Sequence, residues 1–291
     1  MSAEFLPFLL ALGSASLFAL GAQFQHIGLA TVGSRIGAAI SITTAALFHW
    51  MMAPWMLDWS HWTKAAVLIF VAVGVFRPSL SANLSVSGTR FLGPTLSSAL
   101  GSTSPLFGVA LGVLWLGEVF TWQIGIGTIG IIAAVLVLSL GNLRVESSWP
   151  IWALALPVGA ALIRALAHVF SKIGMEEIPD PYFVGLVGFS VSAVIALTAA
   201  KISRSAPAPN WRMSGPYWFV IAGFMFGTAI ISLNNALLRG DITTVVPIIA
   251  MSPIFSMLLS IFVFKREKLT TRVVIAVLMV VPSVAFIALN R

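Results

Sequence analysis

Two stretches decide the fold of this chain: GSASLFALGAQFQHIGL at residues 13–29 and GAALIRALAHVFSKIGM at residues 159–175. They align without a gap at an offset of 146 residues, and seven of the 17 positions are identical. Because 146 is about half of the 291 residues, the chain reads as a duplicated unit. Duplicated apolar halves are common in membrane transporters, whose binding sites lie where the repeats meet.

The composition places this duplicated unit in a membrane. Hydrophobic residues make up 59% of the chain and charged residues 9%, with a mean hydropathy of +1.02. A soluble domain carries roughly 25% charged residues, so the lipid bilayer is the expected partner. The isoelectric point of 10.6 does not indicate nucleic-acid binding, because the basic residues lie in short loops and no RNA-binding motif accompanies them. The chain has no cysteine, which excludes disulfides and thiolate chemistry.

Ten apolar runs are long enough for membrane helices, which need about 20 residues each. The runs are continuous rather than alternating, which favours helices over strands. The first run is long for a signal peptide and lacks a basic region before it, so we expect it to be retained. The ten expected segments are 5–30, 35–54, 62–87, 91–116, 119–140, 150–175, 181–200, 215–238, 242–264 and 270–289.

The duplication extends beyond the first helix of each half. In the fourth segment Pro105 precedes Glu118 at the helix end, and in the ninth Pro253 precedes Glu267, at offsets of 148 and 149 residues. Each half therefore has five helices, and an odd number inverts the second half relative to the first. The predicted fold is an all-α polytopic membrane protein of two inverted five-helix repeats around a central cavity. We expect the repeats at 1–141 and 149–291, joined by a linker at 142–148.

Small residues spaced four apart allow helices to approach closely. We expect ordinary packing within the chain at three such pairs: Gly33-x-x-x-Gly37, Gly108-x-x-x-Gly112 and Gly223-x-x-x-Gly227.

The chain resembles a known family in the placement of these motifs. Both fourth helices contain a proline and end on a glutamate, as Pro105 with Leu116-Gly117-Glu118 and Pro253 with Lys265-Arg266-Glu267. Over its whole length the chain is similar to the EamA-type exporters of the drug/metabolite transporter superfamily, which include amino-acid and aromatic amino-acid exporters. The second half departs by carrying a Lys-Arg pair where the first has Leu-Gly. The resemblance implies alternating access, with helices five and ten peripheral to a central cavity.

Two arginines stand out because charges at membrane depth are costly and mark function by default. Arg164 falls near the middle of the sixth segment and Arg77 well inside the third, whereas every acidic residue lies at a helix end or in a loop. A buried guanidinium without a carboxylate needs carbonyls, water or an anionic ligand. Its planar fork suits a carboxylate or a phosphate. The alternative is that each arginine binds carbonyls freed by a nearby proline, Pro78 for Arg77 and Pro157 for Arg164.

Further polar residues complete the candidate site. His168 shares a helix face with Arg164, being four residues on, and a histidine beside an arginine favours the neutral form. Gln23 shares a face of the first segment with His26. The alternatives for these residues are packing roles, with proton transfer by His26 or His168 as a minor option.

The fourth segment supplies hydroxyls and a kink. Ser102 and Ser104 precede Pro105, which frees a backbone carbonyl inside the bilayer. Hydroxyls and a free carbonyl could bind an ammonium group, or the serines could bond back to their own helix. Asn83 and Asn234, near the ends of the third and eighth segments, would line a cavity mouth or join helices.

These features predict an inner-membrane exporter of amino acids or similar small carboxylate-bearing metabolites, working by alternating access and without a cofactor. The absence of an acidic residue at membrane depth favours uncoupled transport. Arg164, His168, Gln23, Arg77, Ser102, Ser104, Asn83 and Asn234 are the candidate substrate contacts, with Pro105, Pro253 and Pro78 as kinks for gating. Alternatives are an organic-phosphate or nucleotide-sugar exchanger and a broad drug/metabolite exporter. A receptor or assembly protein would need a sizeable soluble domain or a long tail for contact with its partner, and the sequence shows neither. An enzyme is disfavoured because no Ser-His-Asp set, metal cluster or pair of carboxylates occurs at membrane depth. We expect a monomer or a weak dimer.

The two lines of argument on orientation disagree. Outside the two buried arginines, four Lys or Arg lie on the side of the N-terminus and ten on the other side. The positive-inside rule then places both termini outside the cell, whereas the family resemblance implies that both are inside. Reporter fusions at Arg291 distinguish the two orientations.

Overall fold

A computed structural model describes residues 5–139, 150–202, 209–266 and 268–288. Within these ranges every regular element is helical, and ten helical spans are long and apolar enough to cross a membrane. The predicted all-α polytopic fold is therefore confirmed. The expected linker and Glu267 lie outside the described residues.

The elements of the first half occupy residues 6 to 139. They are α1 (Leu6–Gly28), α2 (Ser34–Met56), the short 3-10 helix η2 (Trp59–Thr63), α3 (Ala66–Gly74), the π-helical turn η3 (Val75–Leu80), α4 (Ser81–Gly101), α5 (Ser104–Leu116) and α6 (Trp122–Ser139). The second half has η5 (Ile151–Leu154), α7 (Ala155–Glu177), α8 (Pro181–Ile202), α9 (Gly215–Arg239), α10 (Ile242–Ile249), α11 (Ser252–Phe262) and α12 (Thr271–Ala288). Four of the ten spans are each built from more than one element.

Prolines interrupt three of these four composite spans. α5 begins one residue before Pro105, and α11 begins one residue before Pro253, at the equivalent place in the second half. In the third span Arg77, which precedes Pro78, has extended backbone angles inside η3, because a proline disfavours the helical conformation of the residue before it. The helices are thus broken at all three expected prolines, whose part in gating stays a prediction.

α4 doubles back on itself and carries the end of the third span and the start of the fourth. The Ser97 hydroxyl oxygen lies 3.2 Å from Thr89 Oγ1 and 3.4 Å from the Ser85 carbonyl oxygen. Twelve residues of straight helix would span about 18 Å. The reversal moves the fourth span to Ala99–Leu116, later than the predicted segment.

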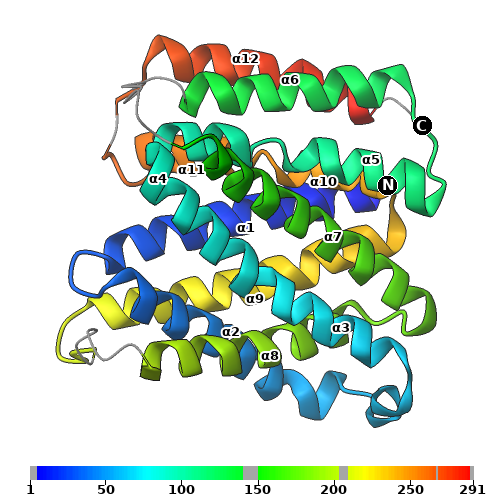
Figure 1. Cartoon of the computed structure of the whole chain (residues 1–291), viewed down its shortest axis with the longest axis vertical. Helices are drawn as coiled ribbons and strands as arrows, with labels where there is room; N and C mark the ends of the chain where they lie inside the picture. The colour runs from blue at the N-terminus through cyan, green and yellow to red at the C-terminus, as the bar shows by residue number, and fades with distance from the viewer. Residues whose placement is uncertain (1–4, 140–149, 203–208, 267, 289–291) are drawn as a thin grey trace.

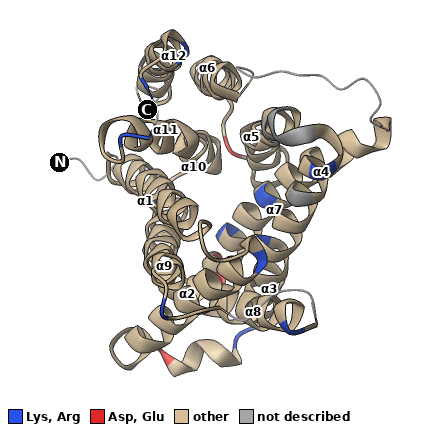
Figure 2. Ribbon diagram, turned by 90° about the vertical axis from the view of Figure 1, so that its left-hand side faces the viewer, with Lys and Arg blue, Asp and Glu red and all other residues tan. Residues whose placement is uncertain are grey.

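The two halves interleave rather than forming separate bodies. α1 packs on α9, α2 on α8 and α9, and α4 and α5 on α7, so the main contacts run between halves. Figure 1 shows the long helices side by side, with α6 and α12 as a pair at one edge. α1 and α7, the first spans of the two halves, run in opposite directions across the layer, as an inverted repeat requires (Figure 1). Viewed along the helices, α1, α9, α10 and α11 face α4, α5 and α7 (Figure 2).

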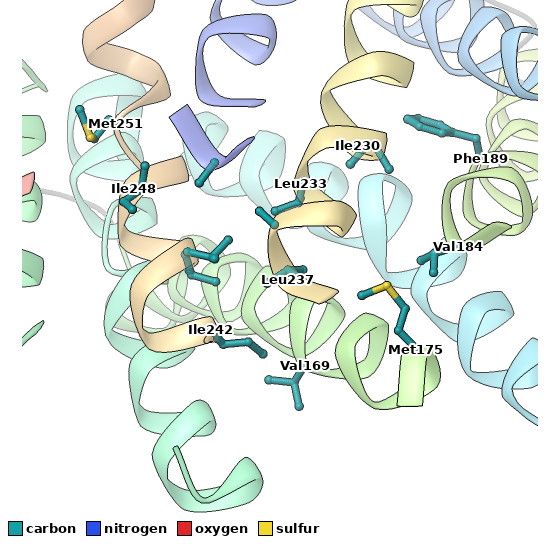
Figure 3. Close-up of a cluster of buried hydrophobic side chains, with 14 of the residues drawn as sticks. Val169, Met175, Val184, Phe189, Ile230, Leu233, Leu237, Ile242, Ile248 and Met251 are labelled. Carbon is teal, nitrogen blue, oxygen red and sulfur yellow. The ribbon is translucent and has the colours of Figure 1, made fainter. Parts of the chain in front are cut away.

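A cluster of buried apolar side chains holds the second half together. Figure 3 shows side chains from α7, α8, α9 and α10 meeting in one group, among them Val169, Leu233, Leu237, Ile242 and Ile248. All five of these side chains are fully buried. Since lipid tails are as apolar as leucine, the cluster stabilises the fold through close packing rather than removal from water. It fixes α10, at whose end the ninth span breaks.

Gly37 tests this close packing. A Cβ added at Gly37 would overlap the ring of the buried Phe219 on α9, whereas one at Gly33 would meet nothing within 4 Å. We expect Gly37→Val to lower the free energy of unfolding by about 1–3 kcal/mol, the usual cost of overpacking. Gly33→Val is the matched control. Thermal unfolding of the two purified variants checks this, and equal melting temperatures would contradict the packing.

Candidate substrate-binding cavity

A cavity of about 760 Å³ lies between the two halves. Its size falls within the range of small-molecule sites. Its walls are mostly apolar, and the only charged side chains among the described lining residues are Arg77 and Arg164. The polar lining residues are Gln25, Ser41, Ser85, Thr89, Ser97, Ser102, Ser104, His168, Ser171, Asn234 and Ser252.

The residues that line the cavity differ in how far they are exposed. We call the face that carries the start of α1 the terminal face, and the face with the α1–α2 connection the opposite face. Thr89, near the opposite face, is an exposed lining residue. Ser171 and Asn234, toward the terminal face, are 5% and 2% exposed.

α7 presents a polar stripe to this cavity. Arg164, His168 and Ser171 are spaced i, i+4 and i+7, which places them on one helix face. The alanines Ala160 and Ala165 on the same helix are fully buried. The small residues allow α7 to pack closely against its neighbours, whereas the polar stripe lines the cavity.

Arg164 binds the backbone at the break between α4 and α5. Its Nη2 donates to the Gly101 carbonyl at 3.0 Å, and its Nη1 donates to the Ser85 hydroxyl at 3.3 Å. Pro105, four residues after Gly101, has no N–H, so this carbonyl lacks its helical partner. Arg164 thus binds a backbone carbonyl that a proline leaves without a donor, as the alternative hypothesis expected. The proline responsible is Pro105 rather than Pro157. Of the five guanidinium N–H groups, three have no protein partner among the described residues.

Arg77 lies beside His168. Arg77 Nη1 is 3.3 Å from His168 Nδ1. Because a guanidinium only donates, Nδ1 must accept and the ring proton lies on Nε2. His168 is then neutral, as the sequence argument expects. Four of the N–H groups of Arg77 have no protein partner in the described part of the chain.

The hydroxyls of the fourth span line the cavity but are already engaged. Ser102 donates to the Ala99 carbonyl at 2.6 Å, and Ser104 donates to the Ala161 carbonyl on α7 at 3.2 Å. Since Arg164 occupies the carbonyl that Pro105 frees, this break does not offer the free acceptor that we expected for an ammonium group.

Two expected contacts lie away from the cavity. Gln23 is buried against α11, where its amide donates to the Ser256 carbonyl and hydroxyl at 2.8 and 3.0 Å. Asn83 is exposed on α4 and donates to the Ser79 carbonyl at 2.9 Å. Neither is among the residues that line the cavity, so a substrate contact by either stays a prediction that this cavity does not support. Asn234 does line it, and its amide joins α9 to α8 through the Pro181 carbonyl at 3.1 Å.

The sequence argument missed several lining residues. Gln25 lies in the cavity wall where Gln23 was expected, and donates to the Ser41 hydroxyl at 3.3 Å. Ser85 and Thr89 share a face of α4 at i, i+4 spacing, the same signal that singled out Arg164 and His168. His26 is exposed at the opposite face, 3.0 Å from Arg266.

α6 is less peripheral than the resemblance implies. It packs chiefly on α12 at the edge of the bundle. Three of its buried side chains nevertheless reach the cavity wall: Ile131, Ile132 and Val135.

Carboxylates join helix ends at the terminal face. Glu118 accepts from the backbone N–H of Ile242 and Thr243 and from the Lys172 ammonium, each at 2.8 Å. One side chain thereby joins the end of α5, the start of α10 and the end of α7. Glu177 likewise accepts from the N–H groups at the start of α3. Anionic side chains suit helix N-termini, which carry partial positive charge.

The Glu118 network also sets the charge of this carboxyl. Burial by itself raises the pKa of Glu118, but the hydrogen bonds from Lys172, Thr243 and Ile242 and the positive charge of Lys172 outweigh it. The pKa of Glu118 therefore lies below its ordinary value, and the group stays ionised in its bound position.

The inverted repeat, the ten spans and the cavity between the two halves define a multi-pass membrane transporter fold. The sequence matches the EamA-like transporter family twice, over residues 6–140 and 150–289, so the chain belongs to that family. It is thus a membrane transporter of the drug/metabolite type, and the family's members are transporters rather than enzymes. No curated protein matches it. One solved crystal structure, described only as that of a protein, aligns with a TM-score of 0.76 over 98% of this chain and 96% of its own. At 18% identity this likeness shows the fold alone.

Proposed function

We propose that this transporter exports amino acids or similar small carboxylate-bearing metabolites across the inner membrane by alternating access. The observation that carries the proposal is the charge of the cavity. Arg77 and Arg164 bring seven unpartnered N–H donors to a lining that, over the described residues, includes no carboxylate. An anionic group supplies the acceptors that these donors lack. The mostly apolar walls suit an aliphatic or aromatic side chain.

Competition in proteoliposomes tests this function. Purified protein is reconstituted, and uptake of labelled L-phenylalanine is measured with an excess of unlabelled amino acids, sugar phosphates or organic cations. We expect amino acids to compete and organic cations to be inert. Stronger competition by sugar phosphates than by amino acids would favour the second candidate, an organic-phosphate exchanger, because two guanidinium groups in one cavity also suit a phosphate dianion.

No acidic residue is among the described residues that line the cavity, which supports uncoupled transport. A proton-coupled exchanger would need a titratable group in the cavity, and His168 already accepts a hydrogen bond from Arg77. We expect the initial rate of phenylalanine efflux from proteoliposomes to stay unchanged when an ionophore collapses a pH gradient of one unit. A several-fold fall in rate on collapse of the gradient would contradict uncoupled transport.

A further inference from the structure

The two helix breaks that border the cavity are equivalent in sequence and different in chemistry. The α4–α5 break at Pro105 and the α10–α11 break at Pro253 are related by the repeat offset of 148 residues. A proline at either place leaves the carbonyl four residues earlier without a helical donor. These carbonyls belong to Gly101 and Ile249, and both residues line the cavity.

Within the described part of the chain, only the first of these carbonyls has a side-chain donor. Arg164 donates to Gly101 at 3.0 Å. At the offset of 146 that aligns the first helices of the halves, the counterpart of Arg164 is Phe18, which lines the cavity but carries no donor. The Ile249 carbonyl therefore keeps the acceptor capacity that Gly101 has given to a guanidinium.

The adjacent serines differ in the same way. Ser104 donates its hydroxyl to the Ala161 carbonyl at 3.2 Å. Its counterpart Ser252 lines the cavity, and its hydroxyl has no partner within the described ranges. The α10–α11 break thus presents a free carbonyl and a free hydroxyl together. The carbonyl also lies at the C-terminal end of α10, where the helix dipole is negative.

We propose that the α10–α11 break is the ammonium-binding subsite of the transporter, with the Ile249 carbonyl and the Ser252 hydroxyl as acceptors. This inference rests on the proposed function, because it assigns the second charged group of a zwitterionic substrate. Arg164 holds the carboxylate on the α7 side of the cavity, and the α10–α11 break holds the ammonium. Each repeat contributes one helix break. Because the position of Arg164 is occupied by Phe18 in the other half, the α4–α5 break binds an anionic group and the α10–α11 break a cationic one.

Equilibrium binding in lipid nanodiscs tests the subsite with two ligands that differ only in the ammonium group. L-Phenylalanine carries it, and L-phenyllactate has a hydroxyl in its place. A hydrogen bond to a charged group contributes about 1.5–3 kcal/mol, so we expect wild type to bind phenylalanine about tenfold to a hundredfold more tightly. Pro253→Ala restores the N–H that can occupy the Ile249 carbonyl, and Ser252→Ala removes the hydroxyl. Pro282→Ala, in α12 and outside the cavity lining, is the matched control.

The ratio of the two dissociation constants decides the outcome. We expect Pro253→Ala and Ser252→Ala each to lower the preference for phenylalanine about tenfold while leaving phenyllactate binding unchanged, and Pro282→Ala to keep the wild-type ratio. An unchanged ratio in Ser252→Ala and in a folded Pro253→Ala overturns the subsite and leaves the proposed function intact. If Pro253→Ala loses both ligands, Ser252→Ala decides alone. Failure of wild type to bind phenylalanine overturns the subsite and the proposed function together.

Discussion

Arg164→Gln should lower phenylalanine uptake into proteoliposomes about tenfold to a hundredfold at substrate concentrations below KM. The guanidinium has three N–H groups without protein partners in the described part of the structure, and they face a cavity without a carboxylate. Losing charge-assisted hydrogen bonds to a substrate carboxylate costs about 1.5–3 kcal/mol. Glutamine can still donate to the Gly101 carbonyl, so the break between α4 and α5 keeps its cross-link.

Arg90→Gln is the matched control for this effect. Arg90 is exposed on α4 and does not line the cavity, so we expect its replacement to leave uptake unchanged. Size-exclusion profiles and melting temperatures of both variants separate loss of binding from loss of folding. Wild-type uptake by a folded Arg164→Gln protein would show that the arginine has only its structural contacts.

Glu118→Gln should open the terminal face. Its carboxylate accepts three hydrogen bonds that join α5, α7 and α10, and its side chain is 6% exposed. Breaking a buried ion pair costs on the order of 3 kcal/mol. This destabilises the conformation in which α5, α7 and α10 are joined at the terminal face. The equilibrium should therefore shift toward conformations open at the terminal face by at least about tenfold.

Thiol labelling measures this opening, because the chain has no cysteine of its own. Ser171→Cys places a single thiol deep in the cavity toward the terminal face. We expect its reaction with a membrane-impermeant maleimide from the terminal face to be at least about tenfold faster in Glu118→Gln. Asp58→Asn removes an exposed carboxylate on the same face that caps only its own turn, and should leave the rate unchanged. Equal rates in all three proteins would show that Glu118 does not hold the face closed.

The depressed pKa of Glu118 fixes the pH range of this closure. A carboxyl whose pKa is lowered by folding stabilises the folded arrangement above its unfolded pKa, about 4.3 for glutamate, and loses that contribution as the pH falls through the lower folded value. Wild-type closure should therefore persist throughout the neutral range and down to about pH 5.

The fold could be predicted because its signals are local. Each span needs about 20 apolar residues, and the alignment of residues 13–29 with 159–175 gives the duplication. The predicted span boundaries are wrong where the chain turns or reverses, because hydropathy does not record such changes of direction. The third span begins at Ala66 rather than near residue 62, since Asp58 caps the 3-10 turn that precedes it. The fourth begins at Ala99, since α4 folds back between Thr89 and Ser97.

The site could be predicted only where one helix carries the pattern. Arg164 follows from its charge at membrane depth, and His168 from its i, i+4 spacing to Arg164 on α7. Gln23 and Gln25 lie about 200° apart around α1, and both faces of that helix pack against protein, so hydropathy cannot choose the cavity side. The contact of Arg164 with Gly101 joins residues 63 apart in different halves. Such contacts depend on how the repeats interleave, which no local pattern records.

The central claim is that Arg164 binds a substrate carboxylate, and a binding cycle of two ligands and two proteins tests it most directly. Dissociation constants of L-phenylalanine and L-phenylalaninamide, which lacks the carboxylate charge, are measured for wild type and Arg164→Gln in nanodiscs. The account predicts that wild type prefers phenylalanine by about tenfold or more and that Arg164→Gln loses this preference while its affinity for the amide is retained. The same preference for phenylalanine in both proteins would contradict the account.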